Sequence, residues 1–167
     1  LTLTGDYCTS RVYRNENGRA FREITSEIGV GTDENGMGSA VHDFDGDGRL
    51  DWFVTSVSYP QARSEGGCRT ASTGCTGNRL WLNRDGAWED ATDRYGVREG
   101  KWGWGIAAQD LDNDGDRDLL TVNGFYQGEL PPPSNPERPY WEYYLENQTR
   151  LWLNTGSTPW TQVAGAA

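Results

Sequence analysis

The chain has 167 residues, a hydrophobic fraction of 35%, 22 glycines and a formal net charge of −10 at pH 7. A chain of this length buries one ordinary core, and many glycines with regularly spaced turn signals are typical of an all-β protein with short strands. The acidic balance argues against nucleic acid or an anionic membrane surface as partner, and no apolar run is long enough to insert into a bilayer.

The first element expected along the chain is a β-hairpin over residues 12–25, in which two alternating strands flank an N-x-x-G turn. Corresponding segments return at residues 80–92 and 151–163, so the hairpin is an internal repeat. Helical periodicity extends for only a turn or two, near residues 26–28 and 92–95. The sequence therefore predicts three equivalent hairpins and very little helix.

A segment of small residues, G-M-G-S-A-V from Gly36, follows the first hairpin, and G-W-G-I-A-A from Gly103 follows the second. Small side chains let neighbouring strands approach closely, as at the narrow centre of a radial array of sheets. Trp102 and Trp104 lie at the start of the later segment. One of these indoles is a candidate for stacking on a sugar, and packing between sheets is the alternative.

An acidic loop follows the first small-residue segment. Gly48 at position 6 of this loop allows a sharp turn, and the carbonyl of Arg49 is available at position 7. Aspartates stand at positions 1, 3, 5 and 9, which are Asp43, Asp45, Asp47 and Asp51. Carboxylates about 4 Å apart repel each other by roughly 4 kcal/mol per pair at an effective dielectric near 20. Flexible hard oxygen ligands suit calcium, and the alternative is an acidic surface turn that binds no ion.

A second acidic loop repeats the spacing of the first, which favours the metal site over an accidental acidic turn. Its aspartates, at positions 1, 3, 5, 7 and 9, are Asp110, Asp112, Asp114, Asp116 and Asp118. An EF-hand loop would end in a bidentate glutamate at position 12, but Val54 and Thr121 stand there. The residues after position 9 are β-branched or apolar, as in strands. We therefore expect two calcium sites, each in a loop that joins two strands.

Residues 59–78 form an insertion that contains two of the three cysteines. Cys68 and Cys75 bracket a small polar loop, and we expect them to form a disulfide in an oxidising compartment. A pair of free thiols is the alternative, because the spacing matches no zinc pattern. Cys8 is then left without a partner in the chain, and a partner outside the chain would satisfy it.

Residues 124–147 form a second insertion, which carries five of the seven prolines. Stiff polyproline segments beside aromatic side chains suit a docking surface that loses little entropy on binding. The candidate interaction residues are Tyr126, Tyr140, Trp141, Tyr143 and Tyr144. The alternative is that these aromatics fold back over an exposed sheet edge. Asn147 begins an N-x-T sequon and is a candidate glycosylation site.

The motifs recur in one order: inner strand, acidic loop, second strand, connection, third strand, turn and outer strand. Four antiparallel strands per repeat make one blade of a β-propeller. We predict the outer hairpin of a preceding blade in residues 1–35 and full blades in residues 36–102 and 103–167. About two and a half blades do not close a ring of four to eight, so we expect a longer polypeptide, a larger assembly or an open stack.

The motifs G-M-G-S-A-V-H-D-F-D-G-D-G-R-L-D, N-R-L-W-L-N-R-D-G-A-W and G-W-G-I-A-A-Q-D-L-D-N-D-G-D-R-D resemble FG-GAP/VCBS repeats of the ASPIC/UnbV (cartilage acidic protein-like) family. The resemblance covers nearly the whole chain from Arg11 onward. It implies a calcium-binding propeller with about seven blades in the intact protein, located outside the cell, on its surface or in the periplasm. The family's metal-binding aspartates correspond to positions 1, 3, 5 and 9 of both loops, and Asp116 would offer its carbonyl.

The expected function is a calcium-binding, extracytoplasmic module for protein–protein interaction or assembly, in which calcium is structural. We expect no enzyme, because the sequence lacks a second histidine, a nucleophile elbow and a phosphate loop. The expected partners are other protein chains or further copies of this chain. The alternative is a carbohydrate-binding, lectin-like propeller whose partners are glycans.

Overall fold

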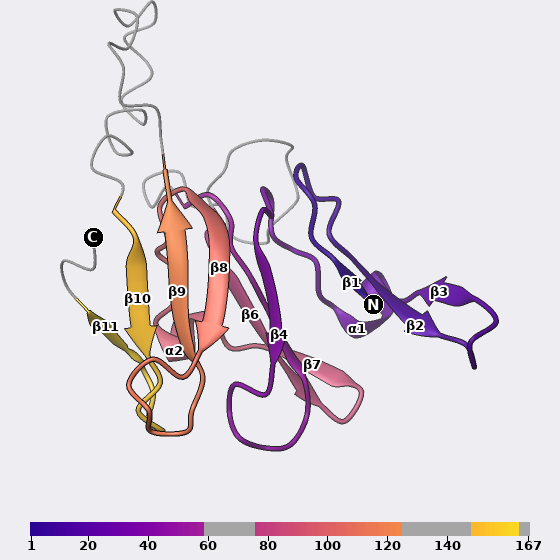
Figure 1. Cartoon of the computed structure of the whole chain (residues 1–167). Coiled ribbons are helices and arrows are strands. Elements are labelled where there is room, and N and C mark those ends of the chain that lie inside the picture. Colours follow the sequence, from indigo (N-terminus) through magenta and orange to yellow (C-terminus); the bar gives the residue numbers. More distant parts are fainter. Residues whose placement is uncertain (59–75, 125–147, 164–167) are drawn as a thin grey trace, which may run out of the picture.

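Three antiparallel sheets make up the part of the chain that the computed structural model describes, residues 1–58, 76–124 and 148–163. Figure 1 shows the sheets side by side in sequence order, from the indigo sheet on the right to the orange and yellow sheet on the left. Two of the three have four strands, in the order in which a propeller blade has them. The predicted all-β fold is confirmed, and the chain is a partial β-propeller.

The first sheet has three strands in the order β1 (Thr2–Leu3), β2 (Arg11–Asn15) and β3 (Phe21–Glu23). The sequence predicted a hairpin here, and the structure adds β1, which pairs with β2 through Thr2↔Val12 and Leu3↔Arg11. Strands of two residues are too short to show an alternating pattern, so this one left no signal in the sequence.

The other two sheets have four strands each. One runs in chain order through β4 (Ser39–His42), β5 (Asp51–Val54), β6 (Arg79–Arg84) and β7 (Ala87–Asp90). The other does so through β8 (Gly103–Gln109), β9 (Asp118–Asn123), β10 (Arg150–Leu153) and β11 (Thr161–Val163). Both acidic loops therefore join an inner strand to its neighbour, as expected.

The two four-stranded sheets share one register. Phe53 pairs with Leu80 between β5 and β6, and Leu120 pairs with Leu151 between β9 and β10. Because successive side chains point to opposite faces of a strand, an equal register places equivalent side chains on equivalent faces. Each position in one sheet can therefore be compared directly with its counterpart in the other.

Two apolar clusters join the three sheets. The cluster between the first and second sheets contains Val12, Ile24, Val30, Trp52, Val54 and Trp81. The cluster between the second and third contains Phe44, Phe53, Leu80, Leu82, Ala91, Tyr95, Val97, Ala108, Leu119, Trp152 and Trp160. Each cluster takes its members from two sheets, so the core lies between blades and not within any one of them. Burying one large side chain of this kind contributes about 1.5–3 kcal/mol.

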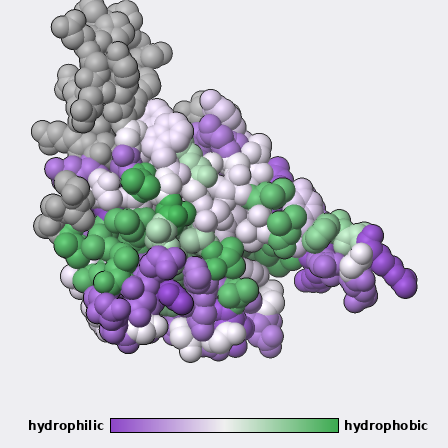
Figure 2. All heavy atoms as spheres, viewed as in Figure 1, coloured by the Kyte–Doolittle hydropathy of each residue, from purple (hydrophilic) through white to green (hydrophobic). Residues whose placement is uncertain are grey.

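One face of the third sheet, the one turned away from the second sheet, is left partly open. It carries Leu120, Leu151 and Leu153, which are partly exposed. Their counterparts in the second sheet, Phe53, Leu80 and Leu82, are fully buried against the third sheet. Figure 2 shows hydrophobic surface over the region of β8 to β10, above hydrophilic surface near the second acidic loop. The open face of the third sheet is thus equivalent to the face of the second sheet that packs against the third.

Two one-turn helices occur among the described residues, α1 (Thr25–Ile28) and α2 (Thr92–Tyr95). Both fall where the sequence shows its brief helical periodicity. No helix in the described ranges is long and apolar enough to span a membrane.

The disulfide expectation needs a correction at Cys8, which is disulfide-bonded in the structure. The predicted Cys68–Cys75 pair is untested and stays a prediction. Both of those cysteines lie outside the described residues. The fold links Cys8 to Thr76 through Glu34: the Cys8 amide donates to the Glu34 carbonyl (2.9 Å), and Glu34 exchanges two hydrogen bonds of 3.2 Å with Thr76.

Candidate metal centre

The two acidic loops have equivalent places in the fold, one between β4 and β5 and the other between β8 and β9. In each loop the aspartate at position 1 organises the turn by accepting backbone amides. Asp43 accepts the amides of Gly46 (2.8 Å), Asp47 (3.1 Å) and Gly48 (2.8 Å). Asp110 accepts those of Asp114 and Gly115, each at 3.1 Å. The chain therefore wraps around the position 1 carboxylate in both loops.

The turn at each loop requires left-handed backbone at positions 4 and 6. Gly46 and Gly48 have φ of 76° and 84°, and Asn113 and Gly115 have φ of 64° and 99°. Glycine adopts this region without steric cost, and asparagine tolerates it better than most residues. Glycine at position 6 was expected from the sequence, and Asn113 fills position 4 of the second loop for the same reason.

The aspartate at position 9 has a second role that the sequence did not reveal. Asp51 is buried and accepts the amides of Phe44 (2.8 Å) and Asn83 (2.9 Å). Asp118 is likewise buried and accepts those of Leu111 (2.7 Å) and Asn154 (2.9 Å). The carboxylate at position 9 therefore holds each loop against the C-terminal end of the third strand of its own sheet. Burial raises the pKa of Asp51, although these two amides act to lower it.

Each loop brings three carboxylates together, with one oxygen of each lying within 4.8 Å of the others. The groups are Asp43, Asp45 and Asp51 in the first loop and Asp110, Asp112 and Asp114 in the second. Calcium binds oxygens at 2.3–2.6 Å, so oxygens on opposite sides of one ion are up to about 5 Å apart. The spacing and the all-oxygen donor set fit calcium. The structure does not place Asp47, Asp116 or Asp118 in these groups.

The first loop is partly neutralised by two arginines. Arg84, at the end of β6, pairs with Asp45 (2.5 Å) and Asp47 (2.8 Å), and Arg49 pairs with Asp47 (2.5 Å). The hydrogen bond to Asp45 raises the pKa of Arg84 above its ordinary value. Desolvation acts to raise the pKa of Asp47, but its interactions with Arg49 hold it below its usual range. No local pattern in the sequence indicates that Arg84 reaches this loop.

The second loop carries more negative charge and lies closer to solvent. Partial desolvation and the neighbouring charges of Asp114 and Asp118 raise the pKa of Asp112. A raised carboxyl pKa means that the charged form is disfavoured, as expected for carboxylates gathered without a cation. The second loop therefore shows the mutual repulsion between carboxylates that the sequence predicts.

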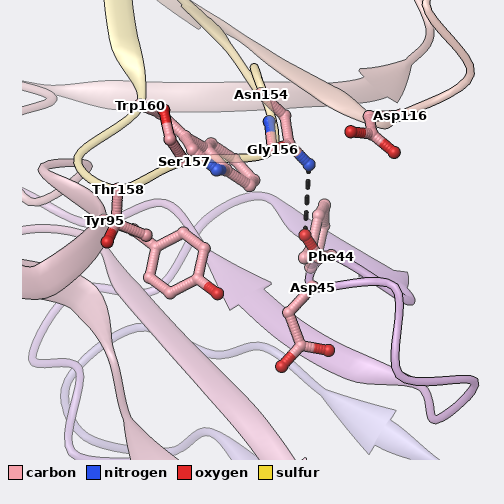
Figure 3. Close-up of a pocket in the computed structure, with 9 residues that line it drawn as sticks. All are labelled: Phe44, Asp45, Tyr95, Asp116, Asn154, Gly156, Ser157, Thr158 and Trp160. Carbon is pink, nitrogen blue, oxygen red and sulfur yellow. Dashed lines mark hydrogen bonds between the residues drawn. The ribbon is translucent and has the colours of Figure 1, made fainter.

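A hollow of about 80 Å³ separates the two loops (Figure 3). Asp45 and Tyr95 line it from the second sheet, and Asp116 and Trp160 line it from the third. Sites for small organic ligands usually measure about 300–1,000 Å³, so this space holds little more than water. Across it, the Asn154 side chain donates a 3.1 Å hydrogen bond to the Phe44 carbonyl, drawn as the dashed line in Figure 3. The loops are thus neighbours joined by a buried contact.

The comparisons with known proteins agree with the repeated architecture. The FG-GAP-like repeat family matches the chain over residues 2–54 and 70–121, which together are more than half of it. The chain belongs to the FG-GAP-like repeat family. A search of curated proteins found no match.

The FG-GAP-like repeats are offset from the blades. Each matched range begins before the third strand of one blade and continues through the acidic loop into the second strand of the next. Each repeat therefore contributes to two neighbouring sheets and carries one acidic loop near its end. FG-GAP repeats indicate a propeller-type protein-interaction module.

Most of the remaining predicted site residues lie outside the described part of this FG-GAP-like chain. These are Cys68, Cys75, Tyr126, Tyr140, Trp141, Tyr143, Tyr144 and Asn147. Trp102 and Trp104 are described: their rings are parallel within 4°, with centroids 6.0 Å apart. Trp104 is 53% exposed, and its indole nitrogen donates to the Gly124 carbonyl at 2.6 Å. These indoles stack on each other, and the two interpretations given from the sequence, sugar stacking and packing between sheets, stay predictions.

Proposed function

We propose that this chain is a calcium-stabilised FG-GAP propeller segment that acts outside the cytoplasm in protein–protein interaction or assembly. Calcium would be structural: bound to the folded loops, it would neutralise clustered carboxylates and stabilise the fold by mass action. No residue is assigned a catalytic role. The observation that carries the proposal is that the equivalent loop of two blades of equal register gathers three carboxylates, with loop positions 1 and 3 common to both groups.

In the first loop, carboxylates of Asp43, Asp45 and Asp51 would hold the ion, with Asp47 and the Arg49 carbonyl as further donors. In the second, Asp110, Asp112 and Asp114 would do so, with Asp118 and the Asp116 carbonyl completing the set. Position 9 can serve both roles, because each carboxylate oxygen has a second lone pair beside the one that accepts an amide.

A finer assignment is also part of the proposal. The ordered motifs support membership of the ASPIC/UnbV (cartilage acidic protein-like) group within the FG-GAP family, and a secreted, cell-surface or periplasmic location. The disulfide at Cys8 supports this location, because disulfides persist in oxidising compartments. The partners would be other protein chains or further copies of this one.

The test is thermal unfolding in calcium and in EDTA. At a free calcium concentration 100 times the Kd, each site should add about 2.7 kcal/mol, and for a chain of this size 1 kcal/mol corresponds to roughly 2–4 °C. Asp43→Asn and Asp110→Asn should each remove part of the calcium-induced rise in Tm, and the double variant should remove nearly all of it. Asp85→Asn, in the turn between β6 and β7, is the control and should behave as the parent. An equal Tm in calcium and EDTA would contradict the proposal.

The exposed Trp104 favours a second candidate function, carbohydrate binding. Saccharide rings stack on exposed indoles, and the parallel Trp102–Trp104 pair holds the outer indole in a fixed orientation. Titration with a panel of mono- and oligosaccharides, followed by tryptophan fluorescence, checks this. A saccharide whose signal disappears in Trp104→Ala but persists in Trp88→Ala would favour the lectin-like function over protein interaction.

A further inference from the structure

Arg84 makes three charged contacts at the end of β6. Its Nη1 atom donates to Asp45 Oδ2 (2.5 Å) and to Asp47 Oδ2 (2.8 Å), and its Nε atom donates to Glu89 Oε2 (3.2 Å). Asp45 belongs to the three-carboxylate group of the first loop, and its side chain is 12% exposed. A guanidinium therefore compensates the carboxylates that a calcium ion would use.

The second loop has no equivalent of this arrangement. Asn83 and Asn154 are counterparts, because each donates its amide to the position 9 aspartate of its own blade. The residue after Asn83 is Arg84, whereas the residue after Asn154 is the uncharged Thr155. The counterpart of Arg49 at position 7 is Asp116, a negative charge in place of a positive one. Within the described ranges, no basic side chain forms an ion pair with a carboxylate of the second loop.

We infer that Arg84 is a displaceable counter-cation of the first loop: it neutralises Asp45 and Asp47 in the absence of calcium and leaves Asp45 when calcium binds. The inference rests on the proposed calcium function. Its consequence is that the two loops differ, with the first binding calcium more weakly because the ion must displace Arg84. No ion pair among the described residues neutralises a carboxylate of the second loop, so this loop binds calcium more tightly.

The geometry provides a place for Arg84 to go. Its side chain is 34% exposed, and Glu89, on the neighbouring strand β7, is 41% exposed and already accepts its Nε. The guanidinium can swing toward Glu89 and solvent without leaving a buried charge unpaired. Arg94 also pairs with Glu89, at 2.9 Å, but contacts neither acidic loop among the described residues, which makes it a matched control.

The experiment is calorimetric calcium titration of the full chain with one loop disabled at a time. In an Asp110→Asn/Asp112→Asn background, which isolates the first loop, Arg84→Gln should tighten calcium binding by on the order of tenfold, because a nearby like charge is removed at a half-exposed site. Arg94→Gln should leave the Kd unchanged. In an Asp43→Asn/Asp45→Asn background, Thr155→Arg should weaken binding at the second loop by a similar factor.

A stability measurement gives an independent readout. In EDTA, Arg84→Gln should lower the Tm, because Asp45 and Asp47 lose their partner, whereas in saturating calcium it should match the parent. If Arg84→Gln does not fold in EDTA, Arg84→Lys keeps the charge without the double contact and should give an intermediate calcium affinity. Calcium binding that is equal or weaker in Arg84→Gln, while the parent binds calcium, overturns the inference alone. Absence of calcium binding in the parent chain overturns the proposed function and the inference together.

Discussion

Asn154 links the two candidate metal loops at the scale of a single residue. Its backbone amide donates to Asp118 in its own blade, and its side chain donates to the Phe44 carbonyl in the preceding blade. The residue is almost fully buried, so neither bond competes with water. The side chain of its counterpart Asn83 donates within its own blade, to the Leu50 carbonyl at 3.4 Å in an exposed setting.

Asn154→Ala should therefore destabilise the chain by about 1–3 kcal/mol, because it leaves the buried Phe44 carbonyl without its donor. Asn83→Ala is the matched control and should cost well under 1 kcal/mol, since water can replace its long, exposed bond. Urea unfolding in EDTA measures both. Equal destabilisation by the two variants would show that the hydrogen bond between blades contributes no more to the free energy of unfolding than the exposed one.

At the scale of the element, each acidic loop depends on left-handed backbone at position 6. Gly115 has φ of 99°, and a Cβ atom added there would meet no atom within 4 Å. Any cost of substitution is therefore conformational and does not come from a clash.

Gly115→Ala should lower stability by about 1–2 kcal/mol, since left-handed backbone costs an L-residue roughly that amount. It should also weaken calcium binding at the second loop, because the Gly115 amide holds the Asp110 carboxylate. Gly124→Ala is the control: a Cβ there also meets nothing, and its φ is not positive. Thermal unfolding and calcium titration check both effects. A Gly115→Ala chain as stable as Gly124→Ala would contradict this account.

Much of the loop architecture could be predicted from the sequence because its determinants are local. Aspartate spacing, glycine at position 6 and the strand-forming residues after position 9 all lie within a dozen residues. What the sequence could not show depends on the register between distant strands. The amides of Asn83 and Asn154 reach Asp51 and Asp118 only after β6 and β10 have paired with their neighbours.

The same limit explains the missed roles of Arg84 and Cys8. Arg84 lies 39 positions from Asp45 in the sequence and reaches it only through the β5–β6 pairing. The surroundings of Cys8 likewise depend on Glu34 and Thr76, which lie far from it in the sequence.

At the scale of the whole molecule, equivalent faces of the second and third sheets have different neighbours. Leu80 is fully buried between blades, and its counterpart Leu151 lies on the partly open face of the third sheet. That face repeats a surface which, one blade earlier, binds another blade. The two equivalent faces therefore differ in how far other described residues cover them.

Leu80→Glu and Leu151→Glu are a matched pair that tests this difference. Leu80→Glu should unfold the chain, because an unpaired charge buried between blades costs several kcal/mol. Leu151→Glu should leave the Tm nearly unchanged and reduce the self-association expected of an exposed apolar face. Thermal unfolding and sedimentation velocity measure the two effects. If both variants unfold alike, the face of the third sheet is as buried as that of the second.

The direction of the second strands has a consequence for how an ion and a partner could influence each other. β5 and β9 both start at an acidic loop and run toward the opposite rim of the sheets. Six residues of extended chain, as in β9, span about 20 Å, roughly twice the Debye length at physiological ionic strength. A molecule recognised at the far rim would be screened from the charge of the ion. Calcium would affect the binding of this molecule only by keeping the strands beneath it paired.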